Sequence, residues 1–336
     1  MHYRQFGRIG MQVSPLCLGS MLFGGKTPEA EAHKIIDNAL DAGINMLDTA
    51  NIYERGQSET VIGTALKQNG KRAKVVLATK VWGRMDDHDP NAAGLHRRHI
   101  REQCEASLRR LQTDYIDVYY VHRQMQNIPI DETLRALDDL IHSGKVLSIG
   151  CSTFSAWSVV ESLWVAKEYG LNRFCCEQPP YHLLDRSIEN ELIPMARTYG
   201  LALMAWSPLA GGLLTGKYQR GIPETGRIQA GSRWGDRHLT PAVLEAVGAL
   251  EQIAQEKECT LSQLALAWCV SRPGITGAVL GARTLEHLIE QLKSLDVSLT
   301  ETDHQRIDSI CPPGKTLVSY YYEDTSADFR PAQYRW

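Results

Sequence analysis

The sequence predicts one α/β domain, a (β/α)8 (TIM) barrel with an N-terminal β-hairpin, a long loop after the seventh strand, and a C-terminal helix plus tail. Short apolar segments alternate with helical segments along the chain, and there are eight of the apolar ones. Such alternation indicates a parallel sheet, and eight units allow a barrel to close. Neither a linker nor a shift in composition divides the 336 residues, so 1–336 is expected to be a single domain.

The apolar segments follow one another in a regular order. Residues 2–14 have the pattern of a hairpin, with Arg8-Ile9-Gly10 near its turn. The expected barrel strands are Val13–Leu18, Asn45–Leu47, Val75–Thr79, Tyr115–Val121, Val146–Gly150, Phe174–Glu177, Leu201–Ala205 and Ala278–Leu280.

The helical segments begin and end at residues that are typical of helix termini. Thr27 can cap the first helix with Pro28 at its first position, Ser58 can cap the second, and Gly43 and Gly144 follow helix ends. Loop 207–240 follows the seventh strand, and an aromatic tail, 311–336, closes the chain. The expected helices are Pro28–Asp41, Ser58–Lys67, Arg98–Arg110, Asp131–His142, Ala156–Tyr169, Ser187–Tyr199, Pro241–Glu256, Leu261–Val270, Leu285–Lys293 and Glu301–Ile310.

An open, doubly wound sheet is the alternative fold. It usually carries a G-x-G-x-x-G turn after its first strand. The turn here reads Leu18-Gly19-Ser20-Met21-Leu22-Phe23-Gly24-Gly25, and its glycines do not have that spacing. The barrel is therefore preferred.

Composition excludes several classes of function. The net charge of −3 gives no basis for binding nucleic acid. The eight cysteines include no C-x-x-C pair, which is typical of reduced core thiols in a cytoplasmic protein. No secretory signal is visible, and the longest uncharged run, Thr198–Gly216, contains Pro208, Gly211, Gly212 and Gly216. We expect a cytoplasmic protein with no membrane partner.

Polar residues stand at the ends of three successive predicted strands. Asp48 ends one strand, with Tyr53 in the loop after it, while Lys80 and His122 follow the next two. Each alone has a structural explanation, such as a turn cap or a core histidine. Together they lie where barrels place their active sites. A lysine and an aspartate there are expected to pair, and the lysine is expected to lower the pKa of the tyrosine.

Five motifs covering nearly the whole chain resemble those of the aldo-keto reductase family, in the family's order. They are Leu47-Asp48-Thr49-Ala50-Asn51-Ile52-Tyr53, Ala78-Thr79-Lys80-Val81-Trp82, Asp117-Val118-Tyr119-Tyr120-Val121-His122-Arg123, Gly150-Cys151-Ser152-Thr153-Phe154 and Trp206-Ser207-Pro208-Leu209. The resemblance implies a barrel that reduces an aldehyde or ketone with NADPH. It implies that Tyr53 protonates the carbonyl oxygen, Lys80 held by Asp48 assists Tyr53, and His122 orients the carbonyl.

The same resemblance implies a cofactor site along one rim of the barrel. Ser152 and Gln178 would hold the carboxamide, Trp206 would stack on the nicotinamide, and Arg283 would bind the 2′-phosphate. Thr153 stands where the family commonly has asparagine. The three positions expected at the adenosine end are His287, Glu290 and Gln291, and two of them also differ from the family pattern. The full set is Ser20, Met21, Asp48, Ser152, Thr153, Gln178, Trp206, Ser207, Pro208, Leu209, Gly211, Lys217, Arg227, Gly281, Arg283, His287, Glu290 and Gln291.

The substrate is expected to contact Tyr53, Trp82 and His122, with Tyr119 and the loop Arg84–Asn91 around the mouth. His96 and His99 have i, i+3 spacing but no evident third ligand, so no metal is expected.

Three functions are compatible with these residues. The first is an NADPH-dependent carbonyl reductase acting on a small aldehyde or ketone. The second is a cofactor-binding regulatory subunit with little turnover, because loop Trp206–Arg227 is similar to that of potassium-channel β subunits. The third is a cofactor-free barrel hydrolase or lyase. The complete set of Asp48, Tyr53, Lys80 and His122 favours the first. The sequence leaves the natural substrate and a homo-oligomeric state open.

Overall fold

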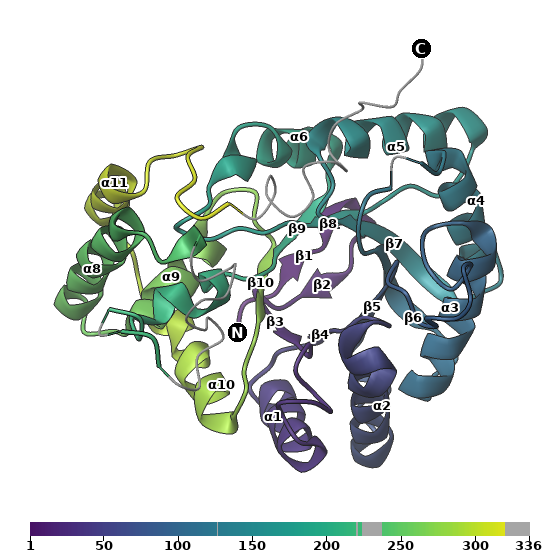
Figure 1. Cartoon of the computed structure of the whole chain (residues 1–336), viewed down its shortest axis with the longest axis horizontal. Coiled ribbons are helices and arrows are strands. Elements are labelled where there is room, and N and C mark those ends of the chain that lie inside the picture. Colours follow the sequence, from purple (N-terminus) through teal and green to yellow (C-terminus); the bar gives the residue numbers. More distant parts are fainter. Residues whose placement is uncertain (126, 220, 224–236, 320–336) are drawn as a thin grey trace.

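Eight parallel strands close into a barrel, as predicted (Figure 1). The structure is a computed structural model that describes residues 1–125, 127–219, 221–223 and 237–319. The strands follow one another around the barrel in the order β10-β3-β4-β5-β6-β7-β8-β9. Their bounds are β3 Leu16–Gly19, β4 Met46–Asp48, β5 Val76–Val81, β6 Ile116–Val121, β7 Val146–Ser152, β8 Cys176–Gln178, β9 Ala202–Ala205 and β10 Gly277–Leu280.

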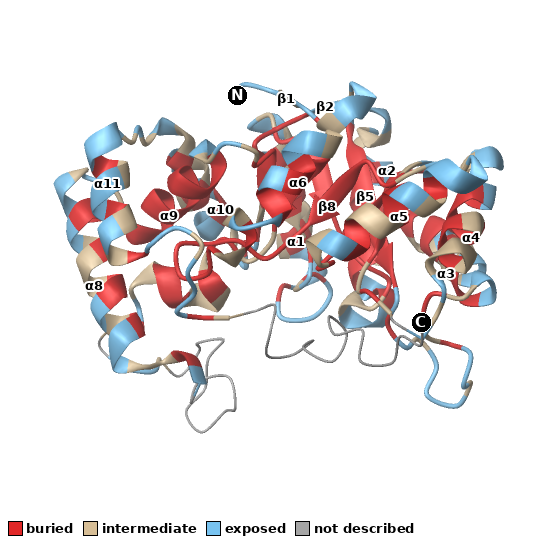
Figure 2. Ribbon diagram, turned by 90° about the horizontal axis from the view of Figure 1, so that it is seen from above, coloured by how far each residue is buried: buried red, intermediate tan, exposed pale blue. Residues whose placement is uncertain are grey.

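Helices surround the barrel and turn their exposed faces outward, while the strands within are buried (Figure 2). No helix of the described residues is both long and apolar enough to cross a membrane. The α-helices are α1 Glu29–Asp41, α2 Gln57–Asn69, α3 Arg97–Leu111, α4 Ile130–His142, α5 Ala156–Tyr169, α6 Leu192–Tyr199, α8 Pro241–Glu256, α9 Leu261–Ser271, α10 Leu285–Leu292 and α11 Glu301–Ile310.

The predicted N-terminal hairpin closes one end of the barrel. Strands β1 (Arg4–Gln5) and β2 (Gln12–Val13) pair antiparallel and lie at one end of the buried strands (Figure 2). Phe6 and Val13 belong to the apolar cluster inside the barrel. Gly7 has φ +55°, and a Cβ there would lie 2.8 Å from backbone atoms of β9 and its neighbours. The hairpin therefore seals this end, and the polar strand ends face the other.

Two predicted elements are divided in the structure. The segment Val13–Leu18 is one: Val13 pairs within the hairpin, and the barrel strand begins only after Pro15, which lacks an N–H for a ladder. The segment Ser187–Tyr199 is the other: a 3-10 turn, η4 (Ser187–Glu189), precedes α6. Pro194 cannot donate to an earlier carbonyl, so it fits only the first turn of α6.

Five strands end later than predicted, among them β3 at Gly19 and β8 at Gln178, and the other three extensions matter for the site. β4 includes Asp48, β5 runs on through Lys80 to Val81, and β7 runs on to Ser152. Lys80 and Ser152 are thus held by the sheet ladder itself. Their side chains project from rigid backbone rather than from loops.

Candidate active site

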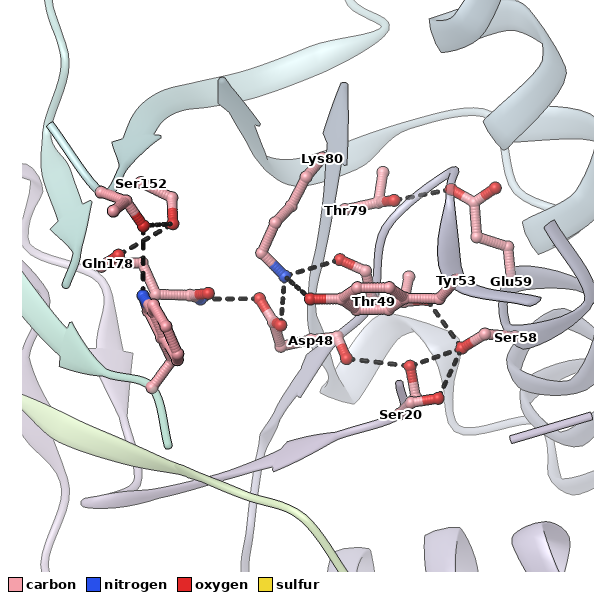
Figure 3. Close-up of polar contacts among 12 residues, drawn as sticks. Ser20, Asp48, Thr49, Tyr53, Ser58, Glu59, Thr79, Lys80, Ser152 and Gln178 are labelled. Atoms are coloured by element: carbon pink, nitrogen blue, oxygen red, sulfur yellow. Dashed lines mark hydrogen bonds and ion pairs between the residues drawn. The ribbon is translucent and has the colours of Figure 1, made fainter. Parts of the chain in front are cut away.

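Asp48, Tyr53, Lys80 and His122 come together as predicted, and Figure 3 shows the first three of them. Lys80 is completely buried, with 0% of its surface exposed. Its Nζ donates to the carboxylate of Asp48, to the carbonyl of Thr49 at 2.8 Å and to the hydroxyl of Tyr53 at 3.4 Å. These contacts use all three ammonium donors. Lys80 therefore joins the carboxylate to the phenol.

Asp48 is fixed from several elements of the barrel. Its second carboxylate oxygen accepts a hydrogen bond of 2.8 Å from Nε2 of Gln178 on β8, as Figure 3 shows. Its backbone carbonyl accepts from the N–H of Ser20 at 3.0 Å and from the Ser20 hydroxyl at 2.9 Å. Because these partners come from the ends of β3 and β8, the carboxylate has little freedom to turn away from Lys80.

A strained turn presents Tyr53. The residue opens the 3-10 turn η2 (Tyr53–Gly56), and its N–H donates to Ala50 at 3.1 Å. Glu54 and Arg55 follow with φ of 46° and 53°, a region that non-glycine residues rarely adopt. Two consecutive residues of this kind persist only where surrounding contacts hold them.

Burial controls the protonation of Tyr53. It raises the pKa of Tyr53 above its ordinary value, although the nearby Lys80 ammonium lowers the pKa of the phenol. The predicted net decrease is wrong, because loss of solvent outweighs the cation. For Lys80, burial lowers the pKa, but Asp48 and Tyr53 together raise it further than burial lowers it. At neutral pH the site therefore holds a protonated phenol beside a charged ammonium.

His122 completes the cluster as a neutral ring. Its imidazole lies edge-on to Tyr53, with 5.6 Å between the ring centroids. Burial, and then the charges of Lys80 and Arg123, hold the pKa of His122 well below its usual value. Nδ1 is buried and has no hydrogen-bond partner among the residues that the structure describes.

The predicted carboxamide-binding residues border this cluster. The hydroxyl of Ser152 donates to the carbonyl of Gln178 at 2.8 Å. Nε1 of Trp206 donates to Oγ1 of Thr153 at 3.2 Å, so the indole leans from the end of β9 towards the end of β7. Thr153 has φ +56°. Ser152, Thr153, Gln178 and Trp206 therefore form one contiguous group beside Asp48.

The loop after β9 winds through left-handed backbone. Ser207, Ala210, Gly211 and Gly212 all have positive φ, and Ser207 Oγ accepts from the N–H of Gly211 at 3.1 Å. A Cβ at Gly212 would lie 3.4 Å from Nζ of Lys217. The Lys217 ammonium thus lies close to Gly212. Pro208 and Leu209 belong to the same loop, and Arg227 lies outside the described residues.

The predicted adenosine-end residues follow β10, which pairs with β9. Gly281 and Arg283 are exposed, as is His287 on α10, and nothing lies within 4 Å of a Cβ built at Gly281. Glu290 accepts a hydrogen bond from the Thr260 hydroxyl. Gln291 is 5% exposed, and its Oε1 has no partner in the described part of the chain.

Comparison with known proteins agrees with this arrangement. A model of the aldo/keto reductase family matches residues 15–312. The chain belongs to the aldo/keto reductase family. It is an oxidoreductase of this family, whose members generally use NAD(P)H.

Three relatives of this aldo/keto reductase cover nearly its whole length. An uncharacterized oxidoreductase, YrpG, of Bacillus subtilis (strain 168) is 40% identical, with 96% of this chain and 99% of the relative aligned. Probable voltage-gated potassium channel β subunits of Oryza sativa subsp. japonica and Arabidopsis thaliana are 39% and 38% identical. Each alignment with them covers 88% of this chain and 92% of the relative.

Trp82 and Tyr119 were both expected to line the substrate mouth of the reductase, but the structure places them in different surroundings. Trp82 directly follows β5 and is exposed. Tyr119 does not line the mouth: it is buried between the barrel and the outer helices, where burial and the neighbouring Cys104 raise its pKa. Side chains alternate along a strand, so Tyr120 points into the barrel and Tyr119 points out.

Sequence reasoning missed two supports of the site. The Ser58 hydroxyl donates to the Ser20 carbonyl at 2.8 Å and lies 2.9 Å from the Thr49 hydroxyl, so it braces Asp48 rather than capping a helix (Figure 3). Glu177 is fully buried and accepts from the N–H of Phe154 at 3.2 Å. The sequence offered one signal for this contact: Glu177 is a charged residue within an expected buried strand, between Cys176 and Gln178. A buried charge needs a hydrogen-bond partner, so a partner for Glu177 could have been expected.

The two histidines considered as metal ligands lie at the start of α3. The ring of His96 accepts from the N–H of His99 and so caps the helix. Among the described residues, no group of three or more His, Cys, Asp and Glu side chains is arranged to hold a metal ion.

Proposed function

We propose that this aldo/keto reductase uses NADPH to reduce an aldehyde or ketone to an alcohol, with Tyr53 as the proton donor. One observation carries the proposal: the buried ammonium of Lys80 contacts both the Asp48 carboxylate and the Tyr53 hydroxyl. The bound nicotinamide supplies the hydride. The protein supplies the proton and the geometry.

The proton transfer follows from the charges at the site. As hydride adds to the carbonyl carbon, negative charge develops on the oxygen, and donors aimed at that oxygen lower the barrier. Tyr53 gives its proton to the oxygen and becomes a phenolate. The Lys80 ammonium 3.4 Å away stabilises that phenolate, and Asp48 and Thr49 keep the ammonium in place. The neutral His122 ring beside Tyr53 hydrogen-bonds the carbonyl and orients it.

Several residues have the chemistry to hold the dinucleotide. The nicotinamide carboxamide is assigned to Ser152, Thr153 and Gln178, and the nicotinamide face to Trp206. Asp48, Ser20 and Met21 border this end. The loop of Ser207, Pro208, Leu209, Gly211 and Lys217 is assigned to the pyrophosphate, because glycines leave room for the Lys217 ammonium above the backbone.

The adenosine end is assigned to the residues that follow β10. Gly281 leaves open space, and Arg283 has a guanidinium suited to a 2′-phosphate, which favours NADP over NAD. Oε1 of Gln291, which has no hydrogen-bond partner among the described residues, is a candidate acceptor for an adenine amino group. His287 and Glu290 flank it on α10. Arg227, outside the described residues, is a further candidate phosphate contact.

The test is oxidation of NADPH in the presence of a panel of aldehydes and ketones, with Tyr53→Phe as the control. Loss of a general acid costs about 100-fold or more, so the variant should bind NADPH and turn over at least that much more slowly. Equal activity of the two proteins would exclude Tyr53 as the proton donor.

The same test separates the alternatives. The names of the rice and Arabidopsis relatives favour a regulatory subunit as the second candidate. That function predicts NADPH binding without oxidation in wild type and variant alike. A cofactor-free hydrolase or lyase predicts no binding of NADPH.

A further inference from the structure

Arg123 stands beside the proposed reaction centre but has no part in the proton transfer described above. It directly follows His122 at the end of β6 and is half-buried. Its Cζ lies 5.9 Å from the ring centroid of Trp206, within reach of a cation–π contact. Trp206 leans towards Thr153 after β7. The guanidinium therefore lies beside the indole, on the residue that directly follows His122 in the chain.

The electrostatics agree with this position. The charge of Arg123 lowers the pKa of both the Tyr53 phenol and the His122 ring. The other cation of the site, Lys80, is completely buried and paired with Asp48. Arg123, in contrast, is half-buried and stands at the rim beside Trp206, where the part of a substrate that extends beyond the carbonyl would lie.

We infer that Arg123 is a specificity-determining residue that selects carbonyl compounds carrying an oxyanion group, a carboxylate or a phosphate. A guanidinium presents planar paired donors that match such groups. The inference rests on the proposed function, since the carbonyl must meet Tyr53 and His122. It adds the class of substrate: an anionic aldehyde or ketone rather than a neutral one.

The experiment compares 4-carboxybenzaldehyde with its neutral analogue methyl 4-formylbenzoate. A charged hydrogen bond of this kind is worth about ten- to hundred-fold in kcat/KM. Wild type should prefer the acid by that factor. In Arg123→Gln the ratio of kcat/KM for the acid to kcat/KM for the ester, which cancels any general loss of activity, should fall to about one, and Arg123→Lys should retain part of the preference. Glyceraldehyde 3-phosphate against glyceraldehyde tests phosphate in the same way.

Arg306→Met is the matched control. Arg306 is exposed on α11 and pairs with Glu256 on α8, so its removal takes one positive charge from the protein without touching the site. The preference for the acid should be unchanged in this variant. A preference that falls equally in Arg306→Met and Arg123→Gln would overturn the inference, as would an unchanged preference in Arg123→Gln.

A binding measurement makes the result independent of turnover. Terephthalate, which cannot be reduced at a carbonyl in this way, is titrated calorimetrically into each protein with NADP⁺ present. Its affinity should fall at least tenfold in Arg123→Gln and stay the same in Arg306→Met. If no aldehyde is reduced by any of the proteins, the proposed function fails and this titration alone decides the role of Arg123. Equal affinity in wild type and Arg123→Gln overturns that role.

Discussion

Thr153 is expected to carry backbone strain that substitution can release. Its φ of +56° lies in the left-handed region, which β-branched residues avoid. Such a conformation costs on the order of 1–3 kcal/mol and persists only where its surroundings impose it. Here the carbonyl of Gln178 accepts the N–H of Thr153 at 3.2 Å, and Glu177 accepts the next N–H, that of Phe154, also at 3.2 Å. The end of β8 therefore holds the strained turn.

Three substitutions separate the strain from the side-chain hydrogen bond. Thr153→Asn suits left-handed backbone and keeps an acceptor for Trp206, so it should stabilise the protein by about 1 kcal/mol. Thr153→Val keeps the strain and loses the bond of 3.2 Å from Trp206, which should cost about 1 kcal/mol. Thr153→Gly relieves the strain but loses that bond and costs about 0.5–1 kcal/mol of backbone entropy, so it should lie near wild type.

Urea unfolding followed by tryptophan fluorescence measures these differences as shifts of the midpoint at constant slope. The expected order of stability is Asn first, then wild type and Gly, then Val. If Thr153→Asn destabilises the protein as much as Thr153→Val does, backbone strain at this residue is not significant, and the reasoning is refuted.

Three further predictions concern charge and pH. Because burial keeps Tyr53 protonated and His122 neutral at pH 7, kcat/KM for reduction should stay level down to pH 6 and fall only above about pH 10, where Tyr53 loses its proton. A fall centred near pH 6.5 would contradict this. Asp48→Asn should destabilise the fold by about 3–5 kcal/mol by leaving the Lys80 ammonium buried without its carboxylate. The double variant Asp48→Asn/Lys80→Met should recover much of that loss in urea unfolding, and no recovery would refute the pairing argument. Burial, and then the neighbouring His96, lower the pKa of His99 from 6.5 to about 4, so the unfolded chain binds a proton more readily between these values. The unfolding free energy should therefore fall by about 3 kcal/mol from pH 6.5 to 4, and His99→Leu should flatten that dependence; an equally steep loss in the variant would contradict it.

The strand ends were predictable because they depend on local pattern. Asp48, Lys80 and His122 each stand at the end of a short apolar run, and parallel strands bring such ends to one rim of the barrel. Pattern could not decide which of Tyr119 and Tyr120 faces the barrel interior. Both faces of a barrel strand are buried, so the run Val118–Val121 contains no alternation to read.

Long-range contacts could not be predicted from the sequence. The bond between Gln178 and Asp48 joins residues 130 positions apart. The Glu177 contact to Phe154 likewise depends on the register of β7 against β8. The prediction that the pKa of Tyr53 is lowered was wrong for a related reason. The nearby cation can be predicted from the sequence, but the extent of burial, whose effect on the pKa outweighs that of the cation, cannot.

Hydride transfer onto a carbonyl held at Tyr53 is most directly tested with NADPH deuterated at the transferable C4 position. Mass spectrometry of the product from 4-carboxybenzaldehyde or methyl 4-formylbenzoate should find one deuterium on the alcohol carbon with wild type. Within the same reaction time, Tyr53→Phe, still binding NADPH, should form almost none of that product. An alcohol without deuterium, or equal labelled product from both proteins, would contradict the role assigned to this site.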